Sequence, residues 1–294
     1  MKYTYDLQSH SCFSDGDETP EELVKTAKDS GLHGLVLTDH NTTLGYERFS
    51  QACYESKLET IAGVEITARY EGVEIHILGY STKFKSDVLQ EGLRETINGY
   101  NERSRKLAES CKKTGLANLN FDEIFKRRPL GTYVTKYDII KAIEKKTGKN
   151  KSETTKMLNA GGALHIPYGD WAMSPQQAVR LIHQANGIAI LAHPGEAKNR
   201  SIKNEVESIK LVDRLIDELI KYEIDGLEIR HPKHNPADET YYDKIVKDFE
   251  LIATGGSDWH GPYHHPDQKL GNAGLTTEEW KNFLKIIQYK TGNP

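Results

Sequence analysis

The sequence predicts an α/β fold: a barrel-like body of parallel strands, interrupted by a helical insertion. Short apolar runs alternate with amphipathic helical patterns over residues 3–80, and the alternation resumes over residues 174–254. Between them, residues 86–174 have a helical pattern throughout. Alternating strands and helices are typical of parallel sheets with helical crossovers. We therefore place the body at residues 1–88 and 175–294 and the inserted cap domain at residues 89–174.

The first half of the body contains four expected strands. A helix start at Thr19-Pro20, with an N-cap residue, a proline and two acids in the first turn, follows the first strand. The run Gly-Leu-Val-Leu at 34–37 is apolar without interruption, as expected of a strand buried on both faces. A second helix is expected over about residues 43–56. The four strands are expected at residues 3–7, 34–37, 60–66 and 73–80.

The second half repeats the pattern. A Ser-Pro pair at 174–175 opens a helix that ends at an Asn-Gly pair at 186–187. The next strands are expected at residues 188–192, 226–229 and 251–254, separated by helices at about 204–222 and 237–249. All of these strands are expected to run parallel.

Composition narrows the class of protein. The chain has 294 residues, of which 37% are hydrophobic and 28% charged, as in an ordinary soluble enzyme. No apolar run approaches the roughly 20 residues that span a bilayer, and the first residues contain no apolar signal core. Cys12, Cys53 and Cys111 show no pairing pattern. We expect a cytoplasmic protein without disulfides or membrane contact, and no obligate protein partner is evident.

Positive charge is concentrated in the insertion. Between Lys126 and Lys156, ten basic residues stand against three acidic ones, a local balance of +7 in a chain of net charge −4. Two interpretations remain open. The stretch is either a solvated helical surface or an electropositive lid that attracts an anionic substrate.

Side chains of the metal-ligand type recur just after, or within, the expected strands. The loops at the carboxyl ends of the strands form the active site of parallel α/β barrels, so we expect these residues to meet. Imidazoles and carboxylates without thiolates suit Mn²⁺, Zn²⁺ or Fe²⁺, and a carboxylate such as Glu65 can bridge two ions. A lone histidine after a strand is more often a satisfied polar residue, but this recurrence makes coincidence improbable. The residues are Gln8, His10, Asp15, Asp39, His40, Glu65, His76, His193, Asp258 and His260.

Other residues are weaker candidates. Arg103 opens the insertion and is a candidate for binding a phosphate, although a surface ion pair is its more common role. Arg230, His231 and His234 follow the strand at 226–229, so we expect at least one of them to bind substrate. His264 and His265 lie in a polar loop and are expected to be solvated.

The order of these motifs resembles that of the PHP (polymerase and histidinol phosphatase) superfamily. The resemblance covers about residues 3–80 and 175–275, through segments 6–16, 38–41, 63–66, 76–79, 192–195 and 256–261. It implies a distorted (β/α)₇ barrel with two or three divalent ions, Mn²⁺ favoured and Zn²⁺ or Fe²⁺ possible. The implied ligand sets are His10, Glu65 and Asp258 with position 8, then Glu65, His76 and His193, then Asp15, His40 and His260. Glu65, Asp39 and His193 are the expected catalytic residues.

The helical insertion is similar to that of the small bacterial PHP phosphoesterases. This implies that metal-activated water hydrolyses a phosphate monoester of a small nucleotide, of the nucleoside 3′,5′-bisphosphate type. An alternative is a 5′→3′ exonuclease acting on short oligoribonucleotides.

Two positions depart from the family pattern. Gln8 stands where the first motif normally has histidine, and an amide carbonyl is a poor neutral ligand beside imidazole. Either the first ion binds weakly or Gln8 lowers the activity of the enzyme. A nucleotide-binding protein with an impaired metal site is therefore a third alternative. Lys136 and Asp138 lie in the segment where the resemblance implies an arginine and a histidine. Lys136 can still meet a phosphate as a point charge, whereas Asp138 would repel one.

Overall fold

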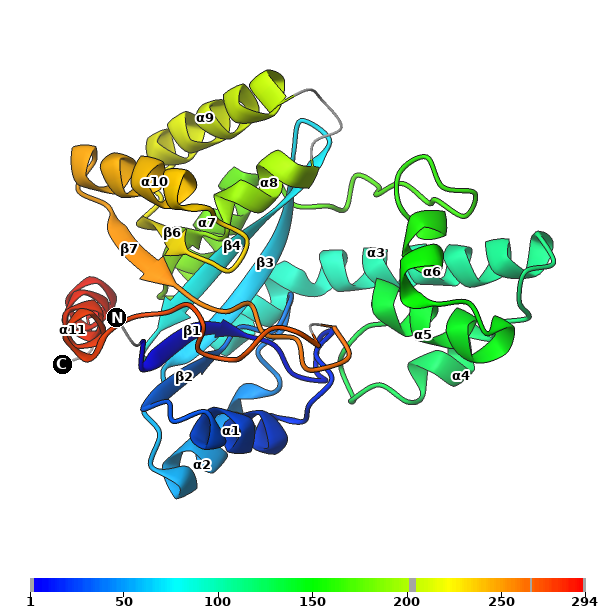
Figure 1. Ribbon diagram of the computed structural model, residues 1–294, viewed down its shortest axis with the longest axis horizontal. Coiled ribbons are helices and arrows are strands. Elements are labelled where there is room, and N and C mark those ends of the chain that lie inside the picture. The colour runs from blue at the N-terminus through cyan, green and yellow to red at the C-terminus, as the bar shows by residue number, and fades with distance from the viewer. Residues whose placement is uncertain (1–2, 201–204, 265, 293–294) are drawn as a thin grey trace.

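The computed structural model describes residues 3–200, 205–264 and 266–292, and within them the strands form two sheets (Figure 1). The smaller sheet pairs β1 with β2, and the larger has the order β3-β4-β5-β6-β7. The strands are β1 (Tyr5–Ser9), β2 (Gly34–Leu37), β3 (Ala62–Tyr70), β4 (Val73–Ser81), β5 (Ile188–Leu191), β6 (Gly226–Arg230) and β7 (Ile252–Gly255). The α/β class predicted from the sequence is confirmed.

The two sheets meet at both edges. A parallel bridge joins Ser9 to Trp259, beyond β7, and another joins His40, beyond β2, to Glu65 in β3. Among the described residues, the strand ladders remain in two sheets rather than in one closed sheet. The bridges nevertheless bring the ends of β1, β2, β3 and β7 together, and this is where the candidate site lies.

The prediction that all strands run parallel is wrong for β4, which is antiparallel to both β3 and β5. Only Glu71 and Gly72 connect β3 to β4, and both have positive φ, at 45° and 82°. Two such residues make the tight turn that suits a right-twisted hairpin, whereas a parallel crossover needs a dozen residues or more.

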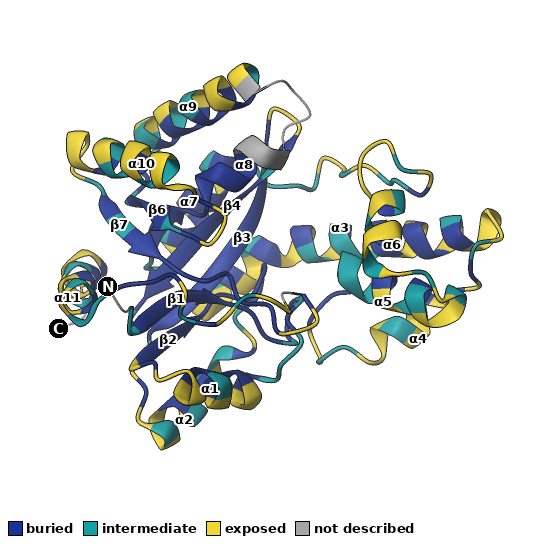
Figure 2. Ribbon diagram, in the orientation of Figure 1, coloured by how far each residue is buried: buried dark blue, intermediate teal, exposed yellow. Residues whose placement is uncertain are grey.

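Helices cover the sheets on their outer sides (Figure 1). Those of the body are α1 (Pro20–Asp29), α2 (Tyr46–Ser56), α7 (Pro175–Gln184), α8 (Pro194–Arg200), α9 (Glu205–Lys221), α10 (Pro236–Asp248) and α11 (Thr277–Thr291). The α7 helix packs on β3, β4 and β5, and α1 contacts β2. Figure 2 shows the strands buried and the outer faces of the helices exposed. No helix among the described residues is long and apolar enough to cross a membrane.

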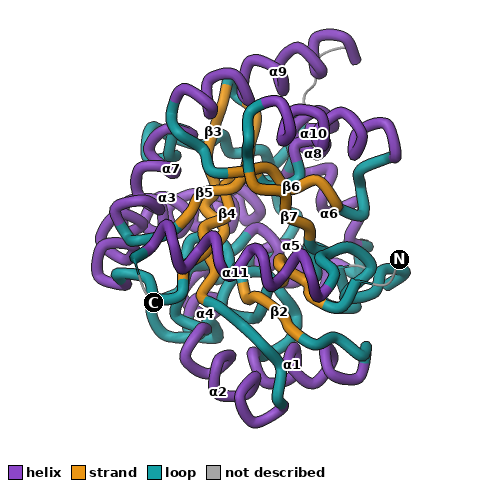
Figure 3. The backbone as a smooth tube through the Cα atoms, turned by 90° about the vertical axis from the view of Figure 1, so that its left-hand side faces the viewer, coloured by secondary structure: helices purple, strands orange, loops and turns teal. Residues whose placement is uncertain are grey.

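The α11 helix was not anticipated from the sequence. Its Trp280, Phe283 and Ile287 are buried in the same core as Tyr80 and Ile190. Figure 3 shows the helix crossing in front of the strands. It therefore closes the core at this side of the sheets.

The insertion contains α3 (Ser86–Lys113), α4 (Phe121–Phe125), α5 (Lys136–Thr147) and α6 (Lys151–Leu158), which gather on one side of the sheets (Figure 1). They share a hydrophobic core that includes Leu107, Ile139 and Leu158. The prediction that this region is helical throughout is wrong over residues 126–135, between α4 and α5, and again beyond Leu158. The chain there contains Gly161 at φ 81° and Pro167, neither of which continues a helix.

Candidate active site

Glu65 lies at the centre of a buried cluster of imidazoles and carboxylates. Side chains alternate along β3, so Val64 and Ile66 pack in the outer core while Glu65 faces the other way. The Oε1 atom of Glu65 lies 2.7 Å from Nδ1 of His76 and 3.0 Å from Nε2 of His193. His76 reaches it because residues 65 and 76 are diagonal neighbours in the register of β3 and β4.

The second oxygen of Glu65 faces His10 and His40. Its Oε2 lies 3.1 Å from Nε2 of His10 and 3.6 Å from Nδ1 of His40. The same nitrogen of His10 lies 3.2 Å from Oδ1 of Asp258, whose other oxygen is 3.5 Å from Nε2 of His231. One carboxylate therefore touches imidazoles that follow or belong to β1, β2, β4 and β5.

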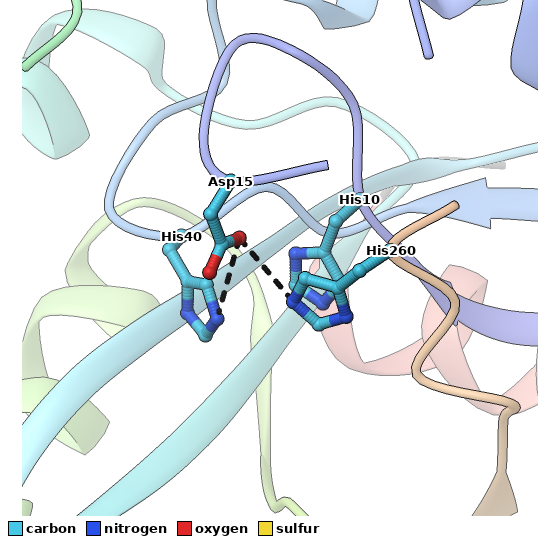
Figure 4. Close-up of side chains that lie close together, drawn as sticks. All are labelled: His10, Asp15, His40 and His260. Atoms are coloured by element: carbon cyan, nitrogen blue, oxygen red, sulfur yellow. Dashed lines mark ion pairs between the residues drawn. The ribbon is translucent and has the colours of Figure 1, made fainter. Parts of the chain in front are cut away.

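A further group stands on loops rather than on strands. Oδ1 of Asp15 lies 3.2 Å from Nε2 of His260 and 3.9 Å from Nε2 of His40. Figure 4 shows the Asp15 carboxylate between the rings of His40 and His260, with His10 beside His260. The rings of His10 and His260 stack with their centroids 4.0 Å apart. We call Asp15, His40 and His260 the loop-borne group, and His10, Glu65, His76 and His193 the strand-borne group.

Unusual backbone conformations occur beside both groups. Asn41, His193 and Asp258 have φ values of 54°, 26° and 53°, which cost energy in residues other than glycine and cluster at functional sites. The backbone N–H of His193 donates to the buried carboxylate of Glu228 at 2.9 Å. The side-chain oxygen of Asn41 accepts from the backbone N–H of Thr67 at 3.0 Å. Specific hydrogen bonds thus hold two of these positions, Asn41 and His193.

The cluster has the character of a cation site. In each of three groups, the potential ligand atoms lie within 4.8 Å of one another. Several of these buried atoms lie close to one another but not in hydrogen-bond geometry, and so have no hydrogen-bond partner. These atoms are Nδ1 and Nε2 of His10, Nδ1 of His40, Oε2 of Glu65 and Oδ1 of Asp15. Buried polar atoms are normally satisfied, so a set of unsatisfied donors to metal fits divalent ions bound between them.

The pKa directions differ among the ligands. Burial acts to lower the pKa of His10 and of His260, but nearby carboxylates outweigh it and raise both, so these two rings would give up a proton on binding metal. Other ligands are already in the form that binds metal. Burial raises the pKa of Glu65, but the surrounding imidazoles, His40 foremost, outweigh it and hold this pKa well below the usual carboxyl range. Burial likewise raises the pKa of Asp15, and His260 and His40 outweigh it. Burial lowers the pKa of His193 to about 3 and that of His40 to about 4. Ionised carboxylates and neutral imidazoles are the forms that bind metal.

Gln8 is fully buried in β1, beside Gly256, and neither atom of its amide has a hydrogen-bond partner. A Cβ atom at position 256 would come within 2.5 Å of Cβ of Gln8, so the two segments approach closely. An unsatisfied amide in such a place costs energy. The unpaired amide of Gln8 is what we expect of a side chain that binds an ion or a ligand.

The structure gives Asp39 a different surrounding from the one expected of a catalytic residue. Its carboxylate accepts hydrogen bonds from the backbone N–H of Ser11 at 2.8 Å and from the hydroxyls of Ser11 and Ser14 at 2.6 Å. These bonds fix the turn that carries Asp15. Both oxygens of Asp39 are engaged in holding this loop.

Arg230 and His234, expected to bind substrate, have structural partners instead. The guanidinium of Arg230 is paired with Glu279 at 2.5 Å and donates to the carbonyl of Gly274, so it extends towards α11. His234 donates from Nδ1 to the carbonyl of Ile229 and accepts at Nε2 from the N–H of Gly195. Arg230 was expected just after the strand, but β6 extends to it, and its register with β7 is irregular between residues 228 and 230.

The residues expected in the insertion also have partners. Arg103 is buried, donates to the carbonyl of Ile166 at 2.8 Å and lies 4.4 Å from the ring centre of Tyr168. Lys136 donates to the side chain of Asn159. Asp138 is bound by Thr135 and lies 3.5 Å from Arg128, so the expected repulsion of a phosphate is neutralised locally.

Two further residues lie near the cluster: His231, which was only a weak candidate from the sequence, and Glu228, which was not predicted. His231 lies closer to it than Arg230 or His234, and Glu228 is fully buried beneath His193. Alternation along β6 would have placed Glu228 on the inner face. His264 was expected to be solvated but is buried, with Nε2 3.5 Å from Asp17, whereas His265 lies outside the described residues.

Comparisons with known proteins agree with this geometry. A family model described as the PHP domain matches residues 6–229. The 5′-3′ exoribonuclease Rnm of Escherichia coli is 30% identical over 263 residues, covering 88% of this chain and 85% of that protein. The 3′,5′-nucleoside bisphosphate phosphatase of Chromobacterium violaceum is 27% identical over 266 residues, covering 87% of each. A solved structure from Bifidobacterium adolescentis, named as a candidate metal-dependent phosphoesterase, has a TM-score of 0.81 at 25% identity and covers 97% of this chain and 96% of its own.

Proposed function

The chain belongs to the PHP domain family and is a metal-dependent phosphoesterase, and we propose that it removes a phosphate monoester from a small nucleotide of the nucleoside 3′,5′-bisphosphate type. The observation that carries this proposal is the cluster around Glu65, in which buried ligand atoms converge and several of them have no hydrogen-bond partner. The similarity to a bisphosphate phosphatase over most of both chains supports the substrate class.

The residues would divide the work as follows. Two or three divalent ions, Mn²⁺ favoured and Zn²⁺ or Fe²⁺ possible, would supply Lewis-acid polarisation of the phosphoryl oxygens and activate water when bound. Glu65 would serve two ions, because its two oxygens face different imidazoles. His10 with Asp258, and His76 with His193, would complete two sites on either side of it. The loop-borne group would hold a third ion.

Within this function, we assign the catalytic body to residues 1–88 and 175–294 as a distorted (β/α)₇ barrel. The bridges at residues 9 and 40 support this view, since they link the two sheets at both edges. We assign residues 89–174 as a cap domain. Their separate hydrophobic core supports that assignment.

A second candidate is 5′→3′ exonuclease activity on short oligoribonucleotides. The 30% identity to the exoribonuclease Rnm favours it. The third possibility, a nucleotide-binding protein with an impaired metal site, is motivated by Gln8, whose buried amide has no partner.

One experiment separates the three. Metal content is measured on purified protein by mass spectrometry, alongside phosphate release from a nucleoside 3′,5′-bisphosphate, a nucleoside 5′-monophosphate and a 5′-phosphorylated tetraribonucleotide. Metal binding with fastest turnover of the bisphosphate supports the proposal. Fastest release of mononucleotides from the tetraribonucleotide selects the exonuclease. Nucleotide binding without turnover of any ester would select the impaired site.

A further inference from the structure

Four residues of the insertion, all within residues 126–151, contact the loops that carry the loop-borne group. Arg128 makes two of these contacts. Its guanidinium donates to the carbonyl of Phe13 at 3.1 Å and to that of Ser14, the two residues that precede Asp15. Only 9% of the side chain is exposed, and Asp138 lies 3.5 Å from its other terminal nitrogen. A guanidinium held in this way fixes the backbone at Asp15.

Tyr133 makes another contact. Its hydroxyl donates to the backbone carbonyl of His40 at 3.2 Å and lies 3.4 Å from the side-chain nitrogen of Asn41. The side chain is buried. The insertion therefore touches the backbone of a second member of the loop-borne group.

Lys141 and Lys151 make further contacts, on the side of His260. Nζ of Lys141 lies 2.9 Å from Oδ1 of Asp17, whose backbone N–H donates to the carbonyl of His260 at 2.9 Å. The other oxygen of Asp17 accepts from the N–H of Tyr263 at 2.9 Å. Nζ of Lys151 donates to the carbonyl of Tyr263 at 3.2 Å. These bonds tie the Asp15 loop and the His260 loop to each other and to α5 and α6.

The strand-borne group is held differently. Glu65 and His76 are members of β3 and β4, whose ladder runs through nine residue pairs. The insertion also reaches this half, since Tyr168 donates to Glu74 and Glu74 lies 3.5 Å from His76, but the sheet itself fixes the backbone there.

We propose that Arg128, Tyr133, Lys141 and Lys151 are positioning residues that complete the loop-borne site for its divalent ion. In this view these four side chains hold the two loops in place, and we call their contacts the clamp. Docking of the insertion then determines whether the third ion binds. The inference rests on the proposed function for the presence of ions, but the clamp itself can be tested without them.

The main test compares Arg128→Gln with Arg127→Gln. Arg127 is the exposed neighbour, so both variants lose the same charge from the same loop. Mn²⁺ bound per chain is measured by equilibrium dialysis over a range of free Mn²⁺. Removing a residue that orients metal ligands typically weakens binding by 10–100-fold. We expect Arg128→Gln to weaken the loosest ion by about tenfold or more and to leave the others unchanged, while Arg127→Gln binds like the parent.

Hydrogen exchange of the metal-free proteins supplies a second readout. We expect residues 11–17 to exchange faster in Arg128→Gln, with β3 and β4 unchanged. Tyr133→Phe, which removes one hydroxyl, provides a milder variant should Arg128→Gln fail to fold. Lys141→Ala is compared with Lys145→Ala, an exposed lysine on the same helix.

The outcomes separate the clamp from the metal. Unchanged Mn²⁺ binding and unchanged exchange at residues 11–17 in Arg128→Gln and Tyr133→Phe would overturn the proposal. Faster exchange at those residues in a protein that binds no Mn²⁺ would keep the clamp and reject the metal sites, and with them the proposed function. Equal weakening of all ions would also overturn the proposal, because the insertion would then support the whole cluster.

Discussion

The two halves of the candidate site are built from different kinds of structure. Glu65 and His76 lie within paired strands, and His10 and His193 follow strands within two residues. Asp15 and His260 lie in loops, at least five residues beyond the ends of β1 and β7. Side chains from the insertion hold these loops. Backbone pairing of β3, β4 and β5 fixes the first half, whereas the second depends on side-chain contacts from the insertion. The strand-borne group should therefore tolerate changes outside it better than the loop-borne group.

The largest loss of metal and activity is expected for Glu65→Gln, which changes the central ligand of the strand-borne group. An amide cannot bridge two cations as a carboxylate does, so most bound metal should be lost. Metal ions contribute several kcal/mol to such reactions, so activity should fall by about a thousandfold or more. Metal analysis and phosphate release provide the measurements. Glu71→Gln, the same change at the exposed end of this hairpin, is the control, and full metal content and rate in Glu65→Gln would refute the central role of this carboxylate.

The next largest effect concerns the framework of the loop-borne half. Asp39→Asn replaces an acceptor of three hydrogen bonds with a group that has one acceptor atom. Hydrogen bonds to charged groups contribute about 1.5–3 kcal/mol, so we expect the free energy of unfolding in urea to fall by that amount.

Ser14→Ala, which removes one of the donors to Asp39, should give a smaller loss in the same direction. A direct catalytic role for Asp39 predicts a different result. In that case Asp39→Asn would lower kcat while the free energy of unfolding and the metal content stayed unchanged.

The candidate ligands could be predicted from the sequence. Ligand-type residues just after, or within, the expected strands predicted members of both halves, and the structure brings them together. The predicted residues include Glu65, His76 and His193 as well as Asp15, His40 and His260. The fold class followed from the same patterns. The reversal of β4 was missed because the prediction weighed strand–helix alternation over the two-residue connection at 71–72.

The contacts of the insertion could not be predicted in this way. Nothing local in the sequence says that Lys141 meets Asp17 or that Arg128 meets the carbonyl of Ser14. The net charge of +7 treats these residues as one positive patch. In the folded protein, several of them are paired with specific partners. The ion pair of Arg230 was not predicted for a related reason, since its partner Glu279 belongs to a helix that was not anticipated.

A smaller effect is expected for Gln8→His, which would extend the strand-borne half. An imidazole nitrogen donates to a divalent ion more strongly than an amide oxygen, and the present amide has no partner. We expect metal content to rise at the site of His10 and Asp258 and the phosphatase rate to rise by about tenfold, which corresponds to about 1.4 kcal/mol of barrier. A variant with unchanged metal stoichiometry and an equal or lower rate on every ester would instead show that Gln8 is suited to another role.

The smallest effect is expected for Lys136→Ala. Arg128, Lys141 and Lys151 already have partners in the loops of the body, so only part of the +7 charge of residues 126–156 can act on a substrate at a distance. Lys136 also binds Asn159, which limits its freedom. We expect kcat/KM to fall with added salt, because screening acts over about 8–10 Å at 0.10–0.15 M, and Lys136→Ala to raise KM by about two- to threefold. The exposed Lys146 on the same helix serves as the control, since Lys146→Ala removes the same charge. A rate that is insensitive to salt, with Lys136→Ala and Lys146→Ala both silent, would mean that the basic stretch is a clamp and a solvated surface and does not attract substrate.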